Sequence, residues 1–218
     1  GILSGGDSTQ GLPAREKLLA AGRTGDRAKA MRAEEAMNMA GSEGKELFRD
    51  HDIIYIYHNQ IDAAGDKIQT EGNLCRAAED AIDDLVKLVR KLTSANVTNI
   101  LITADHGFLY QHKTLDESDF ALADPQGTEI LSRNRRFVLG RGLKPTEGMK
   151  KFTSAQLGMT GDVEVLIPNS INRLRRQGSG SRYVHGGASL QEIVIPVLRV
   201  GKQRTADISQ VSVQIIAP

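Results

Sequence analysis

The sequence predicts an α/β domain with a mostly parallel central sheet, and two apolar runs joined by a helical pattern support that fold class. The runs are residues 52–57, which end in IIYIY, and residues 99–103, NILIT. Continuous apolar runs of this length, rich in β-branched residues, are typical of strands buried on both faces of a sheet. Between them, apolar residues recur every three or four positions from Leu74 to Leu92, which indicates a long amphipathic helix. This order of elements predicts a βαβ unit, whose two strands pair in parallel.

The segments on either side of this unit are assigned more coarsely. We expect helices at 14–22 and 27–40, with Gly22 and Gly41 as the residues that end them, and no apolar strand ahead of residue 53. From 111 to 162 the pattern weakens, and we expect a long excursion that forms a cap or lid, partly helical near 153–158. Further strands are expected at 137–139, 163–167, 193–200 and 211–216.

A length of 218 residues allows one large α/β domain or two small ones, and we expect a single domain over residues 1–218. Hydrophobic residues make up 39% and charged residues 25% of the chain, and 28 Lys and Arg nearly balance 27 Asp and Glu, so no overall positive field favours nucleic acid. Cys75 is the only cysteine, which excludes an internal disulfide framework and favours a reducing compartment. No apolar run approaches the roughly 18 residues of a membrane span. We therefore expect a cytoplasmic protein with no membrane partner.

Acidic and histidine residues follow both apolar runs. Asp105 and His106 follow 99–103 after one alanine, and Asp62 and Asp66 follow 52–57 closely. In open α/β sheets, ligands bind beyond the carboxyl ends of the parallel strands. One helical turn would place Asp62 and Asp66 on one face, where a cation would relieve the repulsion between their carboxylates. The alternatives are that these aspartates cap helices or lie in a solvated loop, with His106 simply packed nearby.

A third candidate is His185, in a glycine-flanked loop ahead of the last strands. The alternative for a single loop histidine is an exposed residue without a function. Ser189 fits the N-cap of a helix better than a nucleophile. Two metal ions share a site in many hydrolases, and the sequence supplies most of the ligands that such a pair requires. The candidate ligands are Asp62, Asp66, Asp105, His106 and His185.

Three motifs resemble one known family. They are Asp-x-x-Gly-Asp at 62–66, Thr-Ala-Asp-His-Gly-Phe at 103–108 and His-Gly-Gly-Ala-Ser-Leu-Gln-Glu-Ile-Val-Ile-Pro at 185–196. Together they resemble the PglZ proteins of bacterial BREX phage-defence systems, over about residues 11–200. The resemblance implies an alkaline-phosphatase-like α/β/α sandwich and a hydrolase that acts on phosphate esters, as a phosphatase or a nuclease-like phosphodiesterase.

The resemblance also implies roles for the candidate ligands. Asp62, Asp66 and His185 would hold one divalent ion, and Asp105 and His106 would hold the second. The wider superfamily usually has histidine where Asp66 stands, and this extra carboxylate favours manganese or magnesium over zinc. His58 and Asn59 would support the ligands without binding metal themselves.

Two parts of the superfamily pattern are missing from the motifs. An earlier strand usually carries a further metal-binding aspartate, and a serine or threonine nucleophile follows it. We expect both upstream of Gly1, so that the chain is the C-terminal portion of a domain incomplete at its N-terminus. The isolated chain is then expected to bind metal weakly and to turn over little substrate.

Substrate and partner assignments follow from the same resemblance. Arginine suits bidentate phosphate recognition, and Arg173, Arg176 and Arg182 are the candidates for substrate binding; the alternative is a solvated basic face. The substrate would be a phosphate ester, with nucleic acid among the candidates, and the partners would be other BREX defence proteins. A second hypothesis is a non-catalytic scaffold or ligand-sensing subunit of a defence complex, and a weaker third is an isomerase similar to phosphoglycerate mutase.

Overall fold

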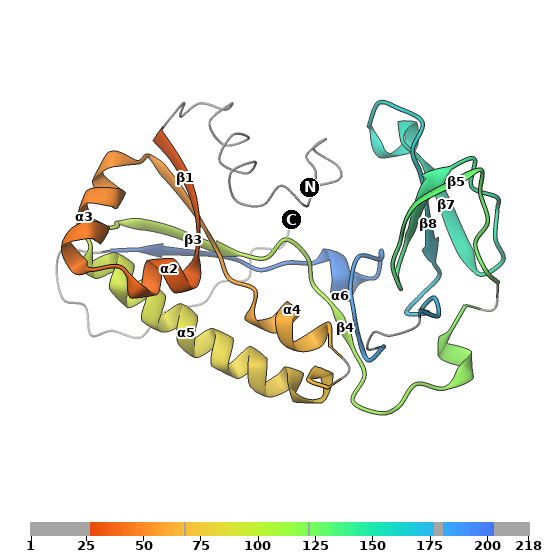
Figure 1. Cartoon of the computed structure of the whole chain (residues 1–218), viewed down its shortest axis with the longest axis horizontal. Helices are drawn as coiled ribbons and strands as arrows, with labels where there is room; N and C mark the ends of the chain where they lie inside the picture. Colours follow the sequence, from red (N-terminus) through yellow and green to blue (C-terminus); the bar gives the residue numbers. More distant parts are fainter. Residues whose placement is uncertain (1–26, 68, 122, 177–180, 203–218) are drawn as a thin grey trace.

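A computed structural model describes residues 27–67, 69–121, 123–176 and 181–202. The helix expected at 14–22 and the strand expected at 211–216 lie outside these residues. Within the described residues, helices and strands mix in two groups of elements, which lie toward opposite ends of the molecule (Figure 1). None of the helices that the structure describes has the length and apolar character needed to cross a bilayer.

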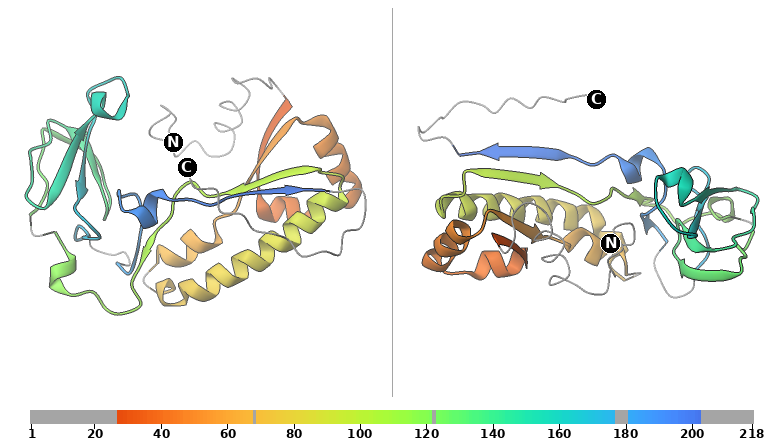
Figure 2. Two further views of the ribbon diagram at one scale, coloured as in Figure 1. Left: turned by 180° about the vertical axis from the view of Figure 1, so that it is seen from behind. Right: turned by 90° about the horizontal axis from the view of Figure 1, so that it is seen from above.

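The first group consists of two strand pairs and the helices packed against them. One pair is parallel and the other is antiparallel. Figure 2 shows the longest helix along one side of the antiparallel pair. The elements are β1 (Ala28–Arg32), α2 (Ala33–Asn38), α3 (Gly41–Asp50), β2 (Ile53–Tyr57), α5 (Leu74–Ser94), β3 (Asn99–Thr103) and β10 (Val197–Gly201).

The helix expected over 27–40 is wrong in its first part, because residues 28–32 form β1. This strand pairs in parallel with β2, so the expectation of no strand ahead of residue 53 is also wrong. Alanine, lysine and methionine are good helix formers. Pairing with β2 overrides that weak preference, since Ala30 and Met31 are buried in the strand.

The strands expected at 52–57 and 99–103 and the helix between them are confirmed as β2, β3 and α5. In the described residues, however, β2 and β3 belong to separate hydrogen-bonded pairs: β2 pairs with β1, and β3 with β10. The core under them holds Met31, Leu88 and Leu92, with Ile54 and Ile100 packed against it. The opposite faces carry exposed Tyr55 and Leu101, so these runs have one covered face and one exposed face.

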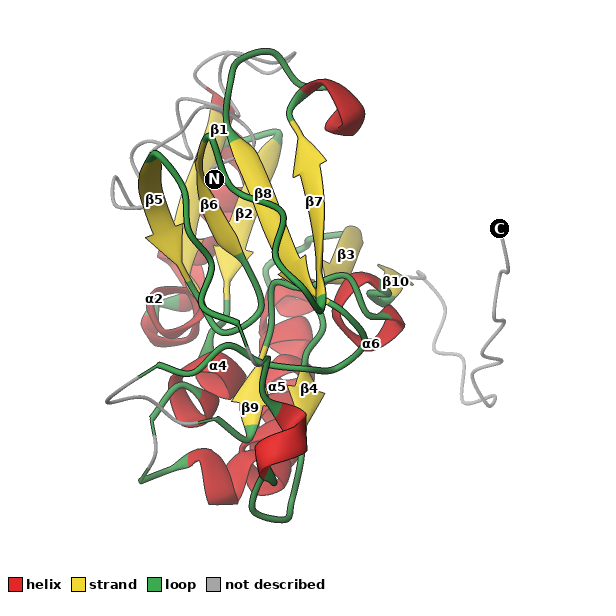
Figure 3. Cartoon of the chain, turned by 90° about the vertical axis from the view of Figure 1, so that its right-hand side faces the viewer, coloured by secondary structure: helices red, strands yellow, loops and turns green. Residues whose placement is uncertain are grey.

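The second group is a four-stranded antiparallel sheet in the order β5-β6-β8-β7 (Figure 3). The segment 111–162, expected to be a long excursion that forms a cap or lid, therefore contains three strands of a sheet with its own core, formed by Val138, Leu143, Leu166 and Leu174. The helical turn expected near 153–158 is the short 3-10 helix η7 (Ala155–Leu157). The strands are β5 (Glu129–Arg133), β6 (Val138–Arg141), β7 (Met149–Thr153) and β8 (Glu164–Pro168).

Short elements lie between the two groups. Two-residue strands β4 and β9 pair antiparallel, with Leu109 opposite Val184 and Tyr110 opposite Tyr183. This pairing brings the segment that follows β3 beside the segment that precedes β10. The elements are α4 (Gln60–Gly65), η5 (Glu71–Asn73), β4 (Leu109–Tyr110), η6 (Glu117–Asp119), β9 (Tyr183–Val184) and α6 (Leu190–Ile193).

Candidate metal centre

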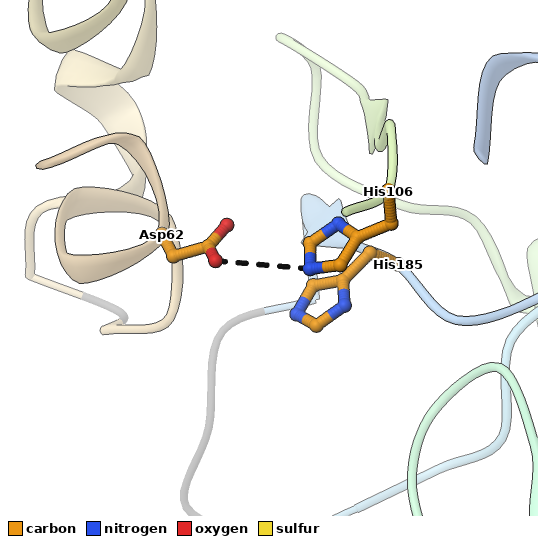
Figure 4. Close-up of side chains that lie close together, drawn as sticks. All are labelled: Asp62, His106 and His185. Atoms are coloured by element: carbon orange, nitrogen blue, oxygen red, sulfur yellow. Dashed lines mark ion pairs between the residues drawn. The ribbon is translucent and has the colours of Figure 1, made fainter. Parts of the chain in front are cut away.

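Three segments far apart in sequence bring one carboxylate and two imidazoles together. Asp62 lies in α4, His106 in the turn after β3, and His185 directly after β9 (Figure 4). One ligand atom from each of these side chains lies within 4.8 Å of the other two. His106 Nε2 is 3.7 Å from Asp62 Oδ2. All three side chains are partly buried.

Two further carboxylates flank this group. Asp105 Oδ1 lies 3.7 Å from His106 Nε2, and Asp66 Oδ1 lies 3.9 Å from His185 Nε2. Three of the five side chains expected as metal ligands therefore lie mutually close, and each of the other two contacts one of the histidines. Asp66 and Asp105 form the exposed side of the cluster, with side chains 64% and 83% exposed.

The two imidazole rings are stacked. Their centroids are 4.0 Å apart and their planes differ by 1°. His106 Nδ1 is 3.0 Å from the carbonyl oxygen of Gly107. Because a carbonyl oxygen only accepts hydrogen bonds, this contact places a proton on Nδ1, and Nε2 is the ring nitrogen that faces Asp62 and Asp105.

The electrostatics of the cluster favour a bound cation. Burial lowers the pKa of His185, and the neighbouring His106 lowers it further, so this imidazole is neutral near pH 7 and able to coordinate a metal. Among the described residues, only the two histidines form ion-pair contacts with Asp62, Asp66 and Asp105. Three carboxylates thus lie beside two imidazole rings. The donor set of carboxylate oxygens and imidazole nitrogens suits zinc, manganese or magnesium.

Tyr183 is a residue of the site that sequence reasoning missed. Its hydroxyl donates a hydrogen bond to Asp62 Oδ1. Burial, assisted by this hydrogen bond to Asp62, raises the pKa of Tyr183 far above its usual value, so the hydroxyl keeps its proton. Tyr183 precedes His185 by two residues, a spacing that places both on one side of an extended strand. That two-residue spacing from His185 is the sequence feature that could have identified Tyr183 as part of the site.

Gly65 allows the Tyr183 ring to approach α4. A Cβ atom built on Gly65 would lie 2.4 Å from the ring. Real Cβ atoms essentially never come this close to another heavy atom, so a larger residue would force Tyr183 or the helix to move. The glycine of the Asp-x-x-Gly-Asp motif therefore has a packing role beside the two aspartates.

The arginines expected to bind substrate lie in different surroundings. Arg173 is fully buried, and its Nη1 donates to the Ile171 carbonyl oxygen. Arg182 donates from Nε to the Gln111 carbonyl oxygen and from Nη2 to that of His112, so it holds the β4–β9 region together. Arg176 is exposed. The cluster of five ligand candidates is thus formed without these arginines.

His58 and Asn59 link β2 to α4, and Asn59 is the N-cap residue of that helix. The expectation that Ser189 caps a helix is confirmed, because it forms a capping box with Glu192 at the start of α6. Thr103 donates its hydroxyl proton to the Pro196 carbonyl oxygen. The hydroxyl groups of Ser189 and Thr103 are therefore engaged away from the cluster.

The chain is similar in sequence to one family of known proteins. Residues 1–200 match the family described as the BREX system PglZ alkaline phosphatase-like domain. The chain is 34% identical over 208 residues to the alkaline phosphatase-like protein BrxZ of Escherichia coli O9:H4 (strain HS), a match that covers 94% of this chain and 24% of that protein. It is 38% identical over 177 residues to the alkaline phosphatase-like protein PglZ of Bacillus cereus (strain H3081.97), covering 78% of this chain and 20% of that protein. The chain thus spans a quarter or less of the length of these relatives.

Proposed function

The chain belongs to the PglZ family of BREX alkaline phosphatase-like domains, and from this premise we propose that it supplies most of the metal ligands of a phosphate-ester hydrolase. The observation that carries the proposal is the convergence of Asp62, His106 and His185, with ligand atoms within 4.8 Å of one another. Asp66 and Asp105 would complete the ligands that this chain provides. The relatives' names, which describe them as alkaline phosphatase-like, support the reaction class.

Two ions fit the donor set better than one. The two imidazole rings are parallel, and their centroids are 4.0 Å apart. Paired metal ions in phosphate-ester hydrolases are about 3.5–4 Å apart. One imidazole for each ion would match this spacing, with Asp66 beside His185 and Asp105 beside His106. We propose zinc, manganese or magnesium, with manganese or magnesium favoured by the three carboxylates.

The metal pair would polarise the phosphate ester, and the residues of this chain would hold it in place. Asp62, fixed by the hydrogen bond from Tyr183, would face both imidazoles. The His106 proton on Nδ1, held by the Gly107 carbonyl oxygen, would keep Nε2 free as a ligand. Thr103 and Ser189 are engaged elsewhere, so we expect the attacking serine or threonine outside the described residues.

The wider setting is part of the proposal. We place the protein in the cytoplasm, as a component of a BREX phage-defence system that works with other BREX proteins. A phosphomonoester or phosphodiester would be its substrate, with nucleic acid among the candidates. A second candidate function is a non-catalytic scaffold in such an assembly, and the exposed apolar side chains of Leu190, Val194 and Val197 favour it, because they offer a surface for a protein partner.

The experiment that tests the phosphate-ester site is a thermal shift titration with metal and an oxyanion. We expect orthovanadate or inorganic phosphate to raise the melting temperature only when manganese or zinc is present, because the oxyanion would bind through the ions. The variant His185→Ala should lose this response, whereas Arg199→Ala, an exposed change on β10, should retain it. Metal binding without any oxyanion response would contradict a phosphate-ester site and favour the scaffold.

Hydrolysis by the chain itself tests the expected position of the nucleophile. We expect little turnover of p-nitrophenyl phosphate or its diester with either metal. Clear hydrolysis that disappears in Asp105→Ala would show that the nucleophile lies within these 218 residues.

A further inference from the structure

One buried carboxylate connects the two segments that carry the stacked histidines. We propose that Glu192, clamped by Arg136, is a positioning residue that sets the spacing of His106 and His185 and so the geometry of the metal pair. The inference rests on the proposed function only where its test measures metal binding. The contacts that carry it are made by groups outside the cluster of five ligand candidates.

On the His185 side, the Glu192 carboxylate holds the loop that leaves the histidine. The Gly187 amide donates to Oε1 at 2.9 Å. The Ser189 amide and hydroxyl donate to Oε2 at 3.2 and 2.7 Å. Gly187 and Ser189 follow His185 by two and four residues, so these bonds fix the course of the backbone next to the imidazole.

On the His106 side, the backbone of Glu192 holds the adjacent residue. The Gly107 amide donates to the Glu192 carbonyl oxygen at 2.8 Å. A Cβ atom on Gly107 would lie 2.1 Å from the Gln191 carbonyl oxygen, so the two chain segments are in direct contact. A shift of residue 192 would therefore move the backbone beside both histidines.

Arg136 fixes Glu192 in turn and connects it to the four-stranded sheet. Its Nε and Nη2 atoms donate to Glu192 Oε1 and Oε2, each at 2.8 Å, which is the bidentate geometry of a strong ion pair. Nη2 also donates to the Ser170 carbonyl oxygen at 2.8 Å, and Nη1 to that of Asn172. Both side chains of the pair are 0% exposed. Arg136 lies just before β6, so the pair joins the sheet to the metal cluster.

The contacts of the carboxylate require its negative charge. Glu192 accepts five hydrogen bonds from Arg136, Gly187 and Ser189. Burial would raise the pKa of Glu192, but the bonds from Arg136 and Ser189 outweigh it and hold that pKa below its usual value. A glutamine has one acceptor oxygen and an amide group that only donates. It would therefore place a donor against the donors of Arg136 or of the 187–189 loop.

A control for lost stability exists within the same molecule. Glu164 in β8 forms a partly buried ion pair with Lys151 at 2.7 Å and accepts a hydrogen bond from the Leu143 amide, also at 2.7 Å. This pair lies within the four-stranded sheet. Glu164→Gln thus removes a comparable charge without touching the segments that carry His106 and His185.

The experiment compares Glu192→Gln with Glu164→Gln by two readouts. In the metal-free chain with labelled histidine, NMR should detect a nuclear Overhauser contact between the rings of His106 and His185. We expect Glu192→Gln to lose this contact and to bind manganese or zinc about 10–100-fold more weakly, the usual effect of removing a group that orients metal ligands. Glu164→Gln should keep both. If Glu192→Gln does not fold, Arg136→Lys, which keeps the charge and loses the bidentate bond, takes its place.

The outcomes separate the two proposals. A folded Glu192→Gln or Arg136→Lys with wild-type ring contact and metal affinity would overturn the positioning role. Equal losses in Glu164→Gln would overturn it too, because they would reflect stability alone. A parent chain that binds no metal would contradict the metal centre, and the ring contact would then still decide the role of Glu192.

Discussion

The structure contains two neighbouring clusters of charged side chains that differ in how their charges are balanced. In the Arg136–Glu192 pair, both side chains are 0% exposed, and the carboxylate accepts bonds from a guanidinium, two amides and a hydroxyl. In the proposed metal cluster, formed by the five candidate ligands, the carboxylates of Asp62, Asp66 and Asp105 are partly or largely exposed and lie beside two histidines.

The difference in charge balance indicates which of the two clusters can bind a ligand. A buried carboxylate whose hydrogen bonds are complete has no capacity for another partner, and it serves to fix the backbone around it. Three carboxylates with no arginine or lysine in ion-pair contact, among the described residues, repel one another and retain free lone pairs. The first cluster therefore determines shape, and the second is suited to bind cations.

Removing Arg136 should have the largest effect on stability. Arg136→Ala would leave the Glu192 carboxylate buried without its ion-pair partner, and breaking a buried pair in this way costs about 3–5 kcal/mol. Urea unfolding measures this loss. The control is Arg141→Ala, which removes exposed ion pairs to Glu129 and Asp162 and should cost less than about 1 kcal/mol. Equal losses of unfolding free energy in the two variants would contradict the claim that the buried pair stabilises the fold more than the exposed pairs do.

A smaller effect is expected from crowding the wall of the metal cluster. Gly65→Ala would press a methyl group against the Tyr183 ring, and overpacking of this kind costs about 1–3 kcal/mol. It should also weaken metal binding, because Tyr183 holds Asp62. Gly41→Ala at the start of α3 is the matched control, since a Cβ atom there meets nothing within 4 Å. Thermal unfolding without manganese measures the loss of stability, and the shift on adding manganese measures metal binding. A Gly65→Ala variant with the stability and metal binding of the wild type would contradict the close contact between Gly65 and Tyr183.

The smallest effect on the metal-free chain should come from the metal cluster itself. Asp66→Asn removes one of three like charges, so it should change the free energy of unfolding by less than about 0.5 kcal/mol, or raise it slightly. The same variant should bind manganese more weakly. A clear loss of metal-free stability in Asp66→Asn would mean that this carboxylate already has a structural partner, and would remove the contrast between the two clusters.

The residues of the Asp–His cluster were easier to single out from the sequence than the framework around them, and their role as metal ligands stays a prediction. Asp105 and His106 closely follow an apolar run, and runs of this kind are recognisable without the structure. The strand β1 was not, because Ala28, Ala30 and Met31 favour a helix locally and form a strand only by pairing with β2. Local propensity carries no information about that distant partner.

The buried ion pair was hidden for a different reason. Arg136 lies in a basic run, RNRR at 133–136, and Glu192 in a short helix, α6, so both resemble surface charges in the sequence. Only the fold shows that 56 residues of chain separate two groups in bidentate contact. Tyr183 was missed similarly, since its link to Asp62 spans 121 residues.

The most direct test of the account is the metal content of the chain after dialysis against manganese or zinc. We predict up to two ions per chain, bound weakly, by elemental analysis and isothermal titration calorimetry. The double variant Asp105→Ala/His185→Ala should lose them while keeping the wild-type unfolding transition, because its Arg136–Glu192 pair is intact. Equal metal content in the wild type and the double variant would contradict the assignment of this cluster as the metal centre.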